Sequence, residues 1–346
     1  MKALTISAHG GFDQIAYRDD VRAPELRSDT DVRVRMAAAA LNHLDVFMVA
    51  GLPGIRITPP WILGADGTGT VESVGADVRH LHAGDRVVVN GGISCRACEY
   101  CERGENPLCV KFGLLGEHTP GTLAEFLVLP AANLRQIPVT AERPHAAAFC
   151  LAALTAWRMV VTRAQLQAGE HVLIQGIGGG VALAALQIAK LRGATVWVTS
   201  SSDEKLAKAA AMGADETLNY AKVDVGRIVR ERTGKRGVDV VIDSVGAASW
   251  KHSLAALGRR GRLVTCGGTT GPIVETDVRK LFWNQWTIMG STMGNDAEFD
   301  AVVSEFSAGR LTPVIDSVFP LAEGRAAVER LASGKQFGKV VVEVEG

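Results

Sequence analysis

The chain has 346 residues, more than one hydrophobic core usually organises, so we expect two domains. Lys and Arg number 37, as do Asp and Glu, so the charge balance favours neither a nucleic acid nor an anionic membrane as partner. The N-terminal segment lacks the apolar stretch of a secretory signal, and no run of about eighteen apolar residues occurs. We therefore expect a cytoplasmic protein that binds a small molecule.

Short β-rich runs separated by Gly, Pro and Asp fill the first third of the chain. They are residues 2–6, 31–41, 67–75, 85–90 and 122–129. This pattern predicts an irregular β domain of the barrel type.

From about Glu142 the sequence is Ala-rich with a helical periodicity, and from His171 onward apolar strands alternate with helices. The expected strands are 171–175, 194–200, 216–220, 238–244 and 261–268. This alternation predicts an α/β domain with a doubly wound parallel sheet and helices on both faces. After about Ser291 we expect one more helix and a final strand that returns to the first domain. The predicted domains are therefore 1–151 with 292–346, and 152–291.

Four cysteines crowd into the segment CRACEYCERGENPLC, within a lobe expected at about 92–112. They are Cys95, Cys98, Cys101 and Cys109. Short spacings let successive sulfurs converge on one tetrahedral zinc, and four thiolates leave no open coordination position, so the predicted zinc is structural. A four-iron cluster also uses C-x₂-C-x₂-C, but the ferredoxin continuation x₃-C-P is absent. Four unligated thiols are the plain alternative.

The first strand of the parallel series leads into the segment GIGGGVALAALQIAK. Glycines let backbone approach a pyrophosphate closely, and the start of the following helix offers unsatisfied N–H groups. The glycines are Gly176, Gly178, Gly179 and Gly180, and Ala182 stands where a third fingerprint glycine is usual. The position between an apolar strand and a helix predicts a dinucleotide-binding turn.

Cofactor choice depends on the end of the second strand, where a carboxylate would bind a ribose 2′-hydroxyl and repel a 2′-phosphate. Ser200 and Ser201 occupy that place, although two acidic residues follow on the next helix. Lys205 offers positive charge and Tyr220 a hydroxyl donor, so we predict NADPH over NADH. The plain alternative for Lys205 is a solvated helix residue.

Together these features resemble the zinc-containing medium-chain dehydrogenase/reductase superfamily, which is alcohol dehydrogenase-like, over essentially the whole chain. The likeness rests on ALNHLDVFMVAGL, ILGADGTGTVESVG, the cysteine segment, LTAWRMV, GGGVALAALQIAK, MGADETLNY and VVIDSVG. It is greatest to quinone-oxidoreductase-like members that keep the structural zinc lobe. The resemblance implies a GroES-like β-barrel domain joined to a Rossmann domain, and a homodimer or homotetramer.

Zinc alcohol dehydrogenases of this superfamily hold a catalytic zinc with Cys, His, Glu and Cys side chains. The matching positions here are Asn42, Ala65, Asp66 and Leu151. The resemblance therefore implies no catalytic zinc shell. An improvised site from Cys150, Asp66 and His43 is the alternative.

The resemblance also implies contacts with the cofactor. His43 matches a pyrophosphate contact, Thr155 a residue near the nicotinamide, Lys205 and Tyr220 a pair that holds the 2′-phosphate, and Lys339 a basic position near the phosphates. The plain alternative for His43 is a surface loop histidine. The full set of expected cofactor contacts is His43, Thr155, Gly176, Gly178, Gly179, Gly180, Val181, Ser200, Ser201, Lys205, Tyr220, Val245, Gly267 and Lys339.

Without a Lewis acid an alcohol proton, with a pKa of about 16, is hard to remove at neutral pH. Reduction of an enone or quinone is easier, because hydride addition places charge on an oxygen that hydrogen bonds stabilise. We expect Asn42 as an orienting amide, with Asp66 and Asp45 as weaker candidates for a proton path. The alternatives are an NAD(P)-dependent alcohol or aldehyde dehydrogenase with a recruited metal, and a dinucleotide-binding protein without catalytic function.

Overall fold

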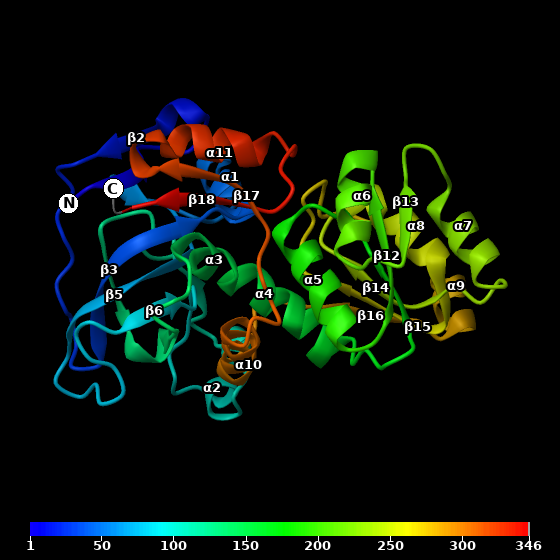
Figure 1. The fold of residues 1–346 in the computed structure, drawn as a ribbon, viewed down its shortest axis with the longest axis horizontal. Helices are drawn as coiled ribbons and strands as arrows, with labels where there is room; N and C mark the ends of the chain where they lie inside the picture. The colour runs from blue at the N-terminus through cyan, green and yellow to red at the C-terminus, as the bar shows by residue number, and fades with distance from the viewer. Residues whose placement is uncertain (345–346) are drawn as a thin grey trace. The chain divides into compact units, whose positions relative to one another are not determined.

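The computed structural model describes residues 1–344, and the chain divides into two compact units. Unit 1 combines Met1–Leu151 with Asn295–Gly346, and unit 2 is Ala152–Gly294 (Figure 1). Among the described residues no helix has the length and apolar character needed to span a membrane. The confirmed fold class is α/β, with one unit mainly β and the other a parallel sheet covered by helices.

Unit 1 is built on a seven-stranded sheet in the order β10-β6-β5-β3-β18-β17, with β9 also paired to β3, and a three-stranded sheet in the order β2-β1-β4. The pairs are antiparallel except β17 with β18, and β7 pairs with β8 in a small separate ribbon. The strands are β1 (Ala3–Ile6), β2 (Ile15–Arg18), β3 (Asp31–Ala40), β4 (Trp61–Ile62), β5 (Asp66–Val74), β6 (Arg86–Val89), β7 (Gly92–Ile93), β8 (Gly113–Leu114), β9 (Phe126–Pro130), β10 (Leu134–Gln136), β17 (Ile315–Pro320) and β18 (Lys339–Glu343).

Short helices connect and flank these strands. The α-helices of unit 1 are α1 (His43–Ala50), α2 (Glu99–Glu102), α3 (Arg143–Ala148), α10 (Asp296–Ser307) and α11 (Gly324–Ala332). Single 3₁₀ turns lie at Phe12–Gln14, Asn106–Leu108, Ala131–Asn133 and Leu321–Glu323. Helix α4 (Cys150–Trp157) contains the boundary between the units and runs into a π-helical turn at Arg158–Arg163.

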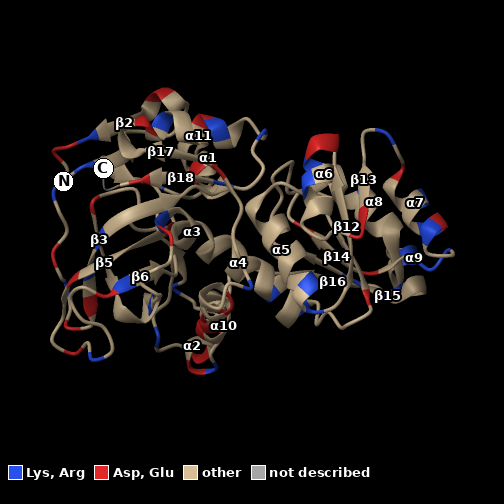
Figure 2. Ribbon diagram, viewed as in Figure 1, with Lys and Arg blue, Asp and Glu red and all other residues tan. Residues whose placement is uncertain are grey.

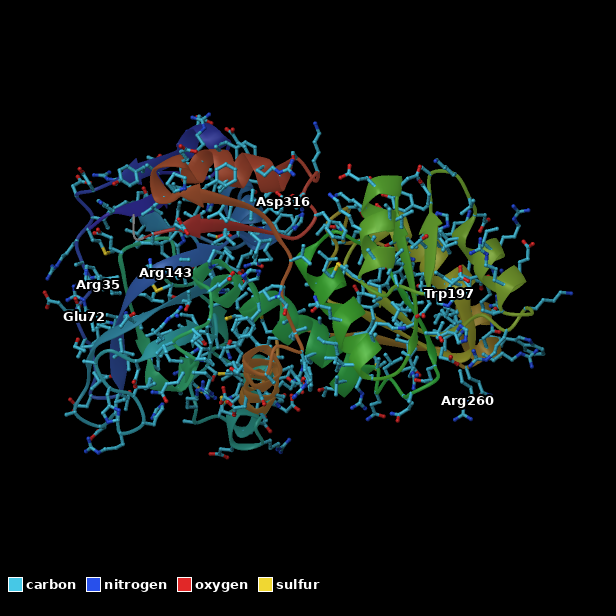
Figure 3. All side chains as sticks on the ribbon, viewed as in Figure 1. Arg35, Glu72, Arg143, Trp197, Arg260 and Asp316 are labelled. Atoms are coloured by element: carbon cyan, nitrogen blue, oxygen red, sulfur yellow. The ribbon has the colours of Figure 1, made fainter. Side chains whose placement is uncertain are left out.

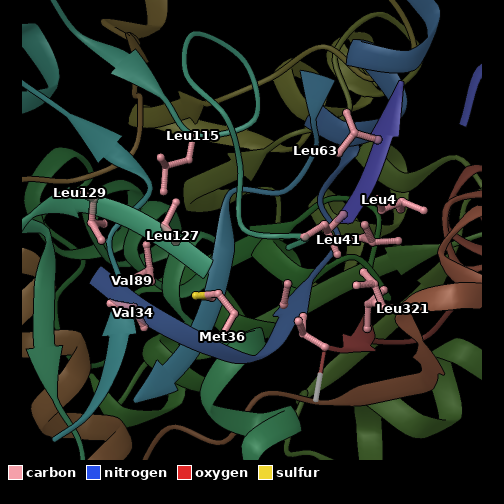
Figure 4. Close-up of a cluster of buried hydrophobic side chains, with 14 of the residues drawn as sticks. Leu4, Val34, Met36, Leu41, Leu63, Val89, Leu115, Leu127, Leu129 and Leu321 are labelled. Carbon is pink, nitrogen blue, oxygen red and sulfur yellow. The ribbon is translucent and has the colours of Figure 1, made fainter. Parts of the chain in front are cut away.

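The long strand β3 shows why this part of the sequence forms a sheet. Val34 and Met36 are fully buried and pack with Leu127 and Leu129 in the core of unit 1 (Figure 4). A side-chain period of two is what a strand with one apolar face requires. Burial of such side chains contributes roughly 1.5–3 kcal/mol each.

The opposite face of β3 carries cations. Arg33 and Arg35 both form ion pairs with Glu72 on β5, each at 2.7 Å, and both guanidinium groups lie over the Phe126 ring. Arg35 and Glu72 are labelled in Figure 3. These pairs tie three neighbouring strands together at the surface. Because they are exposed to water, each contributes little to stability.

Unit 2 is a six-stranded parallel sheet in the order β13-β12-β11-β14-β15-β16. This order reverses between β11 and β14, and dinucleotides bind at such a reversal, outside the carboxyl ends of the strands. The strands are β11 (His171–Ile174), β12 (Thr195–Ser200), β13 (Glu216–Asn219), β14 (Val238–Asp243), β15 (Leu257–Thr265) and β16 (Thr287–Gly290). The helices are α5 (Gly180–Leu191), α6 (Asp203–Ala211), α7 (Val225–Arg232), α8 (Ala247–Ala256) and α9 (Val278–Asn284).

The central strands of this sheet are apolar on both faces, so the pattern of a buried parallel sheet predicted them correctly. Val172, Leu173 and Ile174 of β11 have no exposed surface.

The elements of unit 1 that the sequence did not indicate include β17 and α11. Strand β17 reads IDSVFP and is only partly buried, because it lies at the edge of the sheet with β18 as its one partner. Its sequence therefore lacks both the alternation and the apolar run that mark strands. Helix α11 packs on β17 and β18 and buries Ala327, Val328 and Leu331.

Charged residues of both signs are interspersed along the elements of each unit (Figure 2). This agrees with the equal numbers of acidic and basic residues in the sequence.

Candidate functional site

The four predicted zinc ligands come together in unit 1. The sulfurs of Cys95, Cys98, Cys101 and Cys109 all lie within 4.8 Å of one another. Four sulfurs about 2.3 Å from a tetrahedral zinc are about 3.8 Å apart, so the cluster fits this ion. Backbone N–H groups of Cys101 and Val110 lower the pKa of Cys98 to about 6, which favours a thiolate. The N–H groups of Cys95 and Lys111 point to the Cys109 sulfur at 3.2 and 3.3 Å.

The cysteine lobe is fixed to helix α10. Arg96 forms an ion pair with Asp296, and the Asn106 side-chain oxygen accepts a hydrogen bond from the Asp296 N–H at 3.4 Å. Asp296 is the first residue of α10, where a carboxylate is favoured by the helix dipole. A metal held in this lobe would therefore stabilise the packing of α10 within unit 1.

A second polar cluster lies deep in unit 1, and we call Asn42, Asp66 and Lys339 the Asp66 centre. Sheet register brings its members together. Ala40, near the end of β3, stands opposite Asp66 of β5, and the start of β18 lies on the other side of β3. Asp66 has no exposed surface and Lys339 is 5% exposed.

Hydrogen bonds join the three members of the Asp66 centre. The Lys339 ammonium donates to Asp66 Oδ2 at 3.0 Å and to Asn42 Oδ1 at 2.6 Å. The Asn42 amide nitrogen donates to the same Asp66 oxygen at 3.0 Å. The second Asp66 oxygen accepts from the Leu151 N–H at 2.6 Å. Both oxygens of Asp66 are thus satisfied by the protein, and its charge is matched by an ammonium.

Asp45, a weaker candidate for a proton path, lies on α1 beside this centre and is also buried. Its carboxylate accepts from the backbone N–H groups of Asn42 and Gly64, each at 2.8 Å. Burial raises the pKa of Asp45 to about 6. These contacts are those of a residue that holds two loops in place.

The residues of the improvised metal site are not arranged as one. Among the described residues the cysteine cluster is the group of three or more His, Cys, Asp or Glu side chains placed to hold an ion, and His43, Asp66 and Cys150 do not form another. Burial raises the pKa of Cys150 well above its usual value, so the thiol is neutral. His43 begins α1 and keeps exposed surface, but the protein atoms packed around its ring remove part of its solvation, and this desolvation and the nearby Lys339 charge lower its pKa. His43 is therefore a neutral imidazole at physiological pH.

In unit 2 the glycine-rich turn joins β11 to α5 at the reversal of strand order. Gly176 and Gly178 have φ values of +69° and +120°, which only glycine adopts readily. A Cβ at Gly176 would also lie 2.8 Å from the Val245 side chain. Gly179 precedes the helix and Gly180 begins it. The backbone conformation thus requires glycine at positions 176 and 178, whereas Gly179 has an extended conformation that other residues also adopt.

The small residues after this turn also have clear places. Val181 is partly buried in the first turn of α5, and Ala182 is 3% exposed inside the packed face of the helix. A methyl group is therefore accommodated where a third glycine is usual.

At the end of β12, Ser200 is buried and Ser201 is exposed, and Tyr220 of the next loop donates its backbone N–H to the Ser200 carbonyl at 3.1 Å. Tyr220 is 47% exposed. Lys205 is partly buried in the first turn of α6, its backbone N–H capped by Ser202. These four predicted residues are therefore neighbours at one edge of the sheet.

The two acidic residues of α6 are both paired with lysines. Asp203 accepts from Asn219 at 2.7 Å and forms an ion pair with Lys222. Glu204 pairs with Lys208 at 2.7 Å. Their negative charge is thereby partly offset.

Three further predicted residues lie elsewhere in unit 2. Thr155 is buried in α4, with its hydroxyl 3.9 Å from the Met293 sulfur. Val245 lies in the turn after β14, and Gly267 in the exposed turn after β15. Turns at the carboxyl ends of β11, β14 and β15 thus carry predicted cofactor contacts.

Lys339 is the residue whose surroundings the sequence did not reveal. The resemblance implied a position near the cofactor phosphates, whereas its contacts in the protein are Asp66 and Asn42. One signal was present: a lysine opens the otherwise apolar strand GKVVVEV. Lysine is seldom buried unless paired, so this pattern alone indicates a buried partner.

Two family models match the chain, one within unit 1 and one that covers most of unit 2 and continues into α10. A family model described as "Alcohol dehydrogenase GroES-like domain" matches residues 28–139, and one described as "Zinc-binding dehydrogenase" matches residues 180–308. A zinc-type alcohol dehydrogenase-like protein of Schizosaccharomyces pombe is 32% identical and covers 97% of this chain and 96% of its own. A quinone oxidoreductase of Pseudomonas aeruginosa is 31% identical and covers 99% of each chain.

A solved structure of a protein named NAD-dependent alcohol dehydrogenase superposes with a TM-score of 0.96 at 40% sequence identity, over 100% of both chains. Proteins named for alcohol oxidation and for quinone reduction thus both align with nearly the whole chain.

Proposed function

We propose that this chain, which belongs to the zinc-containing medium-chain dehydrogenase/reductase superfamily and is an oxidoreductase, uses NADPH to reduce an enone, a quinone or a related activated double bond. In this proposal zinc is bound by the four cysteines and has a structural role only. Catalysis then depends on the cofactor and on hydrogen-bond donors of the protein.

The observation that carries the proposal is which residues stand at the positions that match the catalytic zinc ligands, in and beside the Asp66 centre. Positions that hold thiolate and imidazole ligands in zinc alcohol dehydrogenases carry an amide at Asn42, a methyl group at Ala65 and an isobutyl group at Leu151. These groups bind zinc poorly or not at all. The remaining carboxylate, Asp66, is already satisfied by Lys339, Asn42 and a backbone N–H.

This composition suits reduction of a conjugated double bond better than oxidation of an alcohol. Alcohol oxidation needs a means of removing a proton whose pKa is about 16, which a metal usually provides. A bound nicotinamide would supply the hydride, and the enolate oxygen that forms needs only hydrogen-bond donors and a proton.

In the proposal Lys339 provides the positive charge of this region. An ammonium has three N–H bonds, of which Asp66 and Asn42 take two, and the third is left for a cofactor phosphate or a substrate oxygen. Asn42 holds Lys339 and Asp66 in place. Asp45 remains a weaker candidate for proton transfer, because backbone N–H groups bind both of its oxygens.

The preference for NADPH is supported by the end of β12. Ser200 and Ser201 offer hydroxyls where a carboxylate would repel a 2′-phosphate, and Lys205 and Tyr220 stand nearby. Cofactor contacts of His43, Thr155, Gly178, Val181, Val245, Gly267 and Lys339 are part of the same proposal.

An NAD(P)-dependent alcohol or aldehyde dehydrogenase is the second candidate, favoured by the 40% identity with the solved NAD-dependent alcohol dehydrogenase. It requires a second metal ion, which the Asp66 centre would have to bind after releasing Lys339. Alcohol-dependent reduction of NAD⁺ that is lost on mild chelation would support it.

We also propose a cytoplasmic homodimer or homotetramer. Strand β16 is the edge of the parallel sheet, and neighbouring α9 exposes Phe282 by 63% and Trp283 by 75%. Edge strands and large apolar patches are usually covered by a partner. Trp283→Glu should lower the mass measured by light scattering, whereas Val139→Glu, also at an exposed position, should not.

The proposed function is tested by following NADPH oxidation with a panel of enones, quinones and aldehydes, alongside the zinc content per chain. Turnover of an enone or quinone by protein that holds one zinc per chain is the expected result. Turnover of aldehydes alone, with alcohol-dependent reduction of NAD(P)⁺ in the reverse direction, would favour the second candidate.

A further inference from the structure

Unit 2 contains a chain of buried polar side chains that the proposed chemistry does not use. It links Asp243 at the end of β14, Ser253 on α8, Gln175 after β11 and Thr199 on β12, and we call these residues the Asp243 chain. Their exposed surfaces are 0%, 0%, 3% and 0%. Polar groups buried this deeply are costly unless all are hydrogen-bonded.

Every step of the Asp243 chain is a hydrogen bond. The Ser253 hydroxyl donates to Asp243 Oδ2 at 2.7 Å, and its oxygen accepts from the Gln175 amide nitrogen at 3.0 Å. The Thr199 hydroxyl donates to the Gln175 amide oxygen at 2.6 Å. The Thr199 oxygen in turn accepts the backbone N–H of Gly176 at 3.2 Å.

These bonds all have the same direction. The Asp243 carboxylate is an acceptor only, so the Ser253 proton must point to it and the Ser253 oxygen is left to accept from the Gln175 amide nitrogen. The Gln175 amide oxygen then accepts the Thr199 proton, which leaves the Thr199 oxygen to accept a further N–H. The chain therefore ends by holding the N–H of Gly176, the first residue of the glycine-rich turn. A second bond, from Ile177 N–H to the Thr199 carbonyl at 2.8 Å, holds the next residue to the same threonine.

The Asp243 carboxylate also fixes the neighbouring turn. Its Oδ1 accepts the N–H groups of Val245 at 2.8 Å and Gly246 at 3.1 Å. The Val245 side chain is the one that a Cβ at Gly176 would meet. One buried carboxylate thus sets the spacing between the turns after β11 and β14.

We propose that the Asp243 chain positions these two turns for the dinucleotide, with Gln175 and Ser253 as positioning residues for cofactor binding. This inference rests on the proposed use of a nicotinamide dinucleotide. The Gly176 N–H donates to the buried Thr199 hydroxyl and is therefore not available to the cofactor. The Asp243 chain thus affects the conformation of the turn and does not itself contact the cofactor.

The chain offers a matched pair of serines for the test. Ser249 and Ser253 both lie on α8, both are buried, and both place their hydroxyl 2.7 Å from Asp243 Oδ2. Of the two, Ser253 accepts from Gln175 and so continues the chain towards Gly176. Ser249 also contacts Asp243 Oδ1 at 2.9 Å and the Gly246 carbonyl at 3.1 Å, so Ser249→Ala acts on the turn after β14 alone. Ser253→Ala also removes a hydroxyl from Asp243, but it breaks the link to the glycine-rich turn.

The experiment measures the Kd for NADPH by titration, and kcat with a substrate found in the panel, for the full-length protein and both variants. Ser253→Ala should raise the Kd about five- to tenfold, as expected for loss of a buried hydrogen bond, with kcat at saturating NADPH little changed. Ser249→Ala, which keeps the link to the glycine-rich turn, should raise the Kd clearly less than Ser253→Ala does. Equal effects of the two substitutions on the Kd would overturn the inference.

A second pair keeps the test valid should Ser253→Ala fold poorly. Thr199→Val removes the hydroxyl and keeps the branched shape, whereas Thr199→Ser keeps the hydroxyl. Weakened NADPH binding in Thr199→Val that Thr199→Ser restores is expected, and equal Kd values for the two would contradict the inference.

The wild-type protein separates this inference from the proposed function. Binding of NADH in place of NADPH would contradict the cofactor preference, and the same comparison of variants with NADH would still decide the role of the chain. A wild type that binds neither dinucleotide would contradict both.

Discussion

Replacing Lys339 by Met should destabilise unit 1 far more than removal of a surface charge. The substitution keeps an unbranched side chain one atom shorter and removes the ammonium, so Asp66, which has no exposed surface, loses its cation. Removing one partner of a buried ion pair costs about 3–5 kcal/mol, because the other charge stays buried and unpaired. We expect Lys339→Met to lower the free energy of unfolding by this amount.

The magnitude is tested by a double-mutant cycle. Asp66→Asn combined with Lys339→Met removes both charges. Replacing both partners of a buried ion pair often changes the free energy of unfolding little, so that of the double variant should lie within about 1–2 kcal/mol of the wild-type value. Arg35→Met provides the control: Arg35 pairs with Glu72 on the surface of the same sheet and is 50% exposed (Figure 3), so its loss should cost about 1 kcal/mol or less.

Urea unfolding measures the free energies, and hydrogen–deuterium exchange of peptides from β3, β5 and β18 locates the loss within unit 1. Faster exchange in these strands in Lys339→Met, and its reversal in the double variant, is the expected pattern. Should Lys339→Met be no less stable than Arg35→Met, Asp66 would not depend on the Lys339 ammonium, and our interpretation of the Asp66 centre would be wrong.

Three further predictions concern other groups of the protein. Burial raises the pKa of Asp45 from its ordinary 3.8 to about 6. Between these two values the folded protein keeps a proton that the unfolded chain releases. The free energy of unfolding should therefore decrease by up to about 3 kcal/mol as pH rises from 4 to above 6. Urea unfolding of Asp45→Asn should lack this loss, and a difference from wild type that is constant with pH would contradict it. Cys109→Ser should reduce the zinc content and the melting temperature, whereas Cys266→Ser should keep the full zinc content; zinc retained in Cys109→Ser would exclude the cysteine site. Lys205→Ala should weaken NADPH binding by about 1.5–3 kcal/mol and NADH binding much less, with Lys208→Ala as the control on the same helix, and equal losses for both cofactors would refute the assigned contact.

Local patterns were sufficient for much of the fold. The parallel sheet was predictable because its strands are buried on both faces and each is followed by a helix, as with Val172 to Ile174 before the glycine-rich turn. The cysteine spacing also indicated a metal site from local sequence alone, because four cysteines within fifteen residues can bind one ion without help from distant parts of the chain. Strand β17 was not predicted, because a partly buried edge strand has no regular alternation of apolar and polar residues.

The Asp66 centre was not predictable in the same way. Asp66 and Lys339 are separated by 273 residues, and they meet because β18 and β5 pair with opposite sides of β3. The sequence identified Asn42 and Asp66 through their positions in matched motifs, but a single chain without its strand register does not show which cation reaches them. The Asp243 chain was missed for the same reason, since its four residues come from three strand ends and a helix.

Steady-state turnover with NADPH tests the proposed reaction most directly. Protein with one zinc per chain, bound by the four cysteines, is expected to oxidise NADPH in the presence of an enone or a quinone and to leave simple alcohols unoxidised with NADP⁺. Alcohol oxidation that requires a second bound metal ion, with no turnover of any enone or quinone, would contradict it.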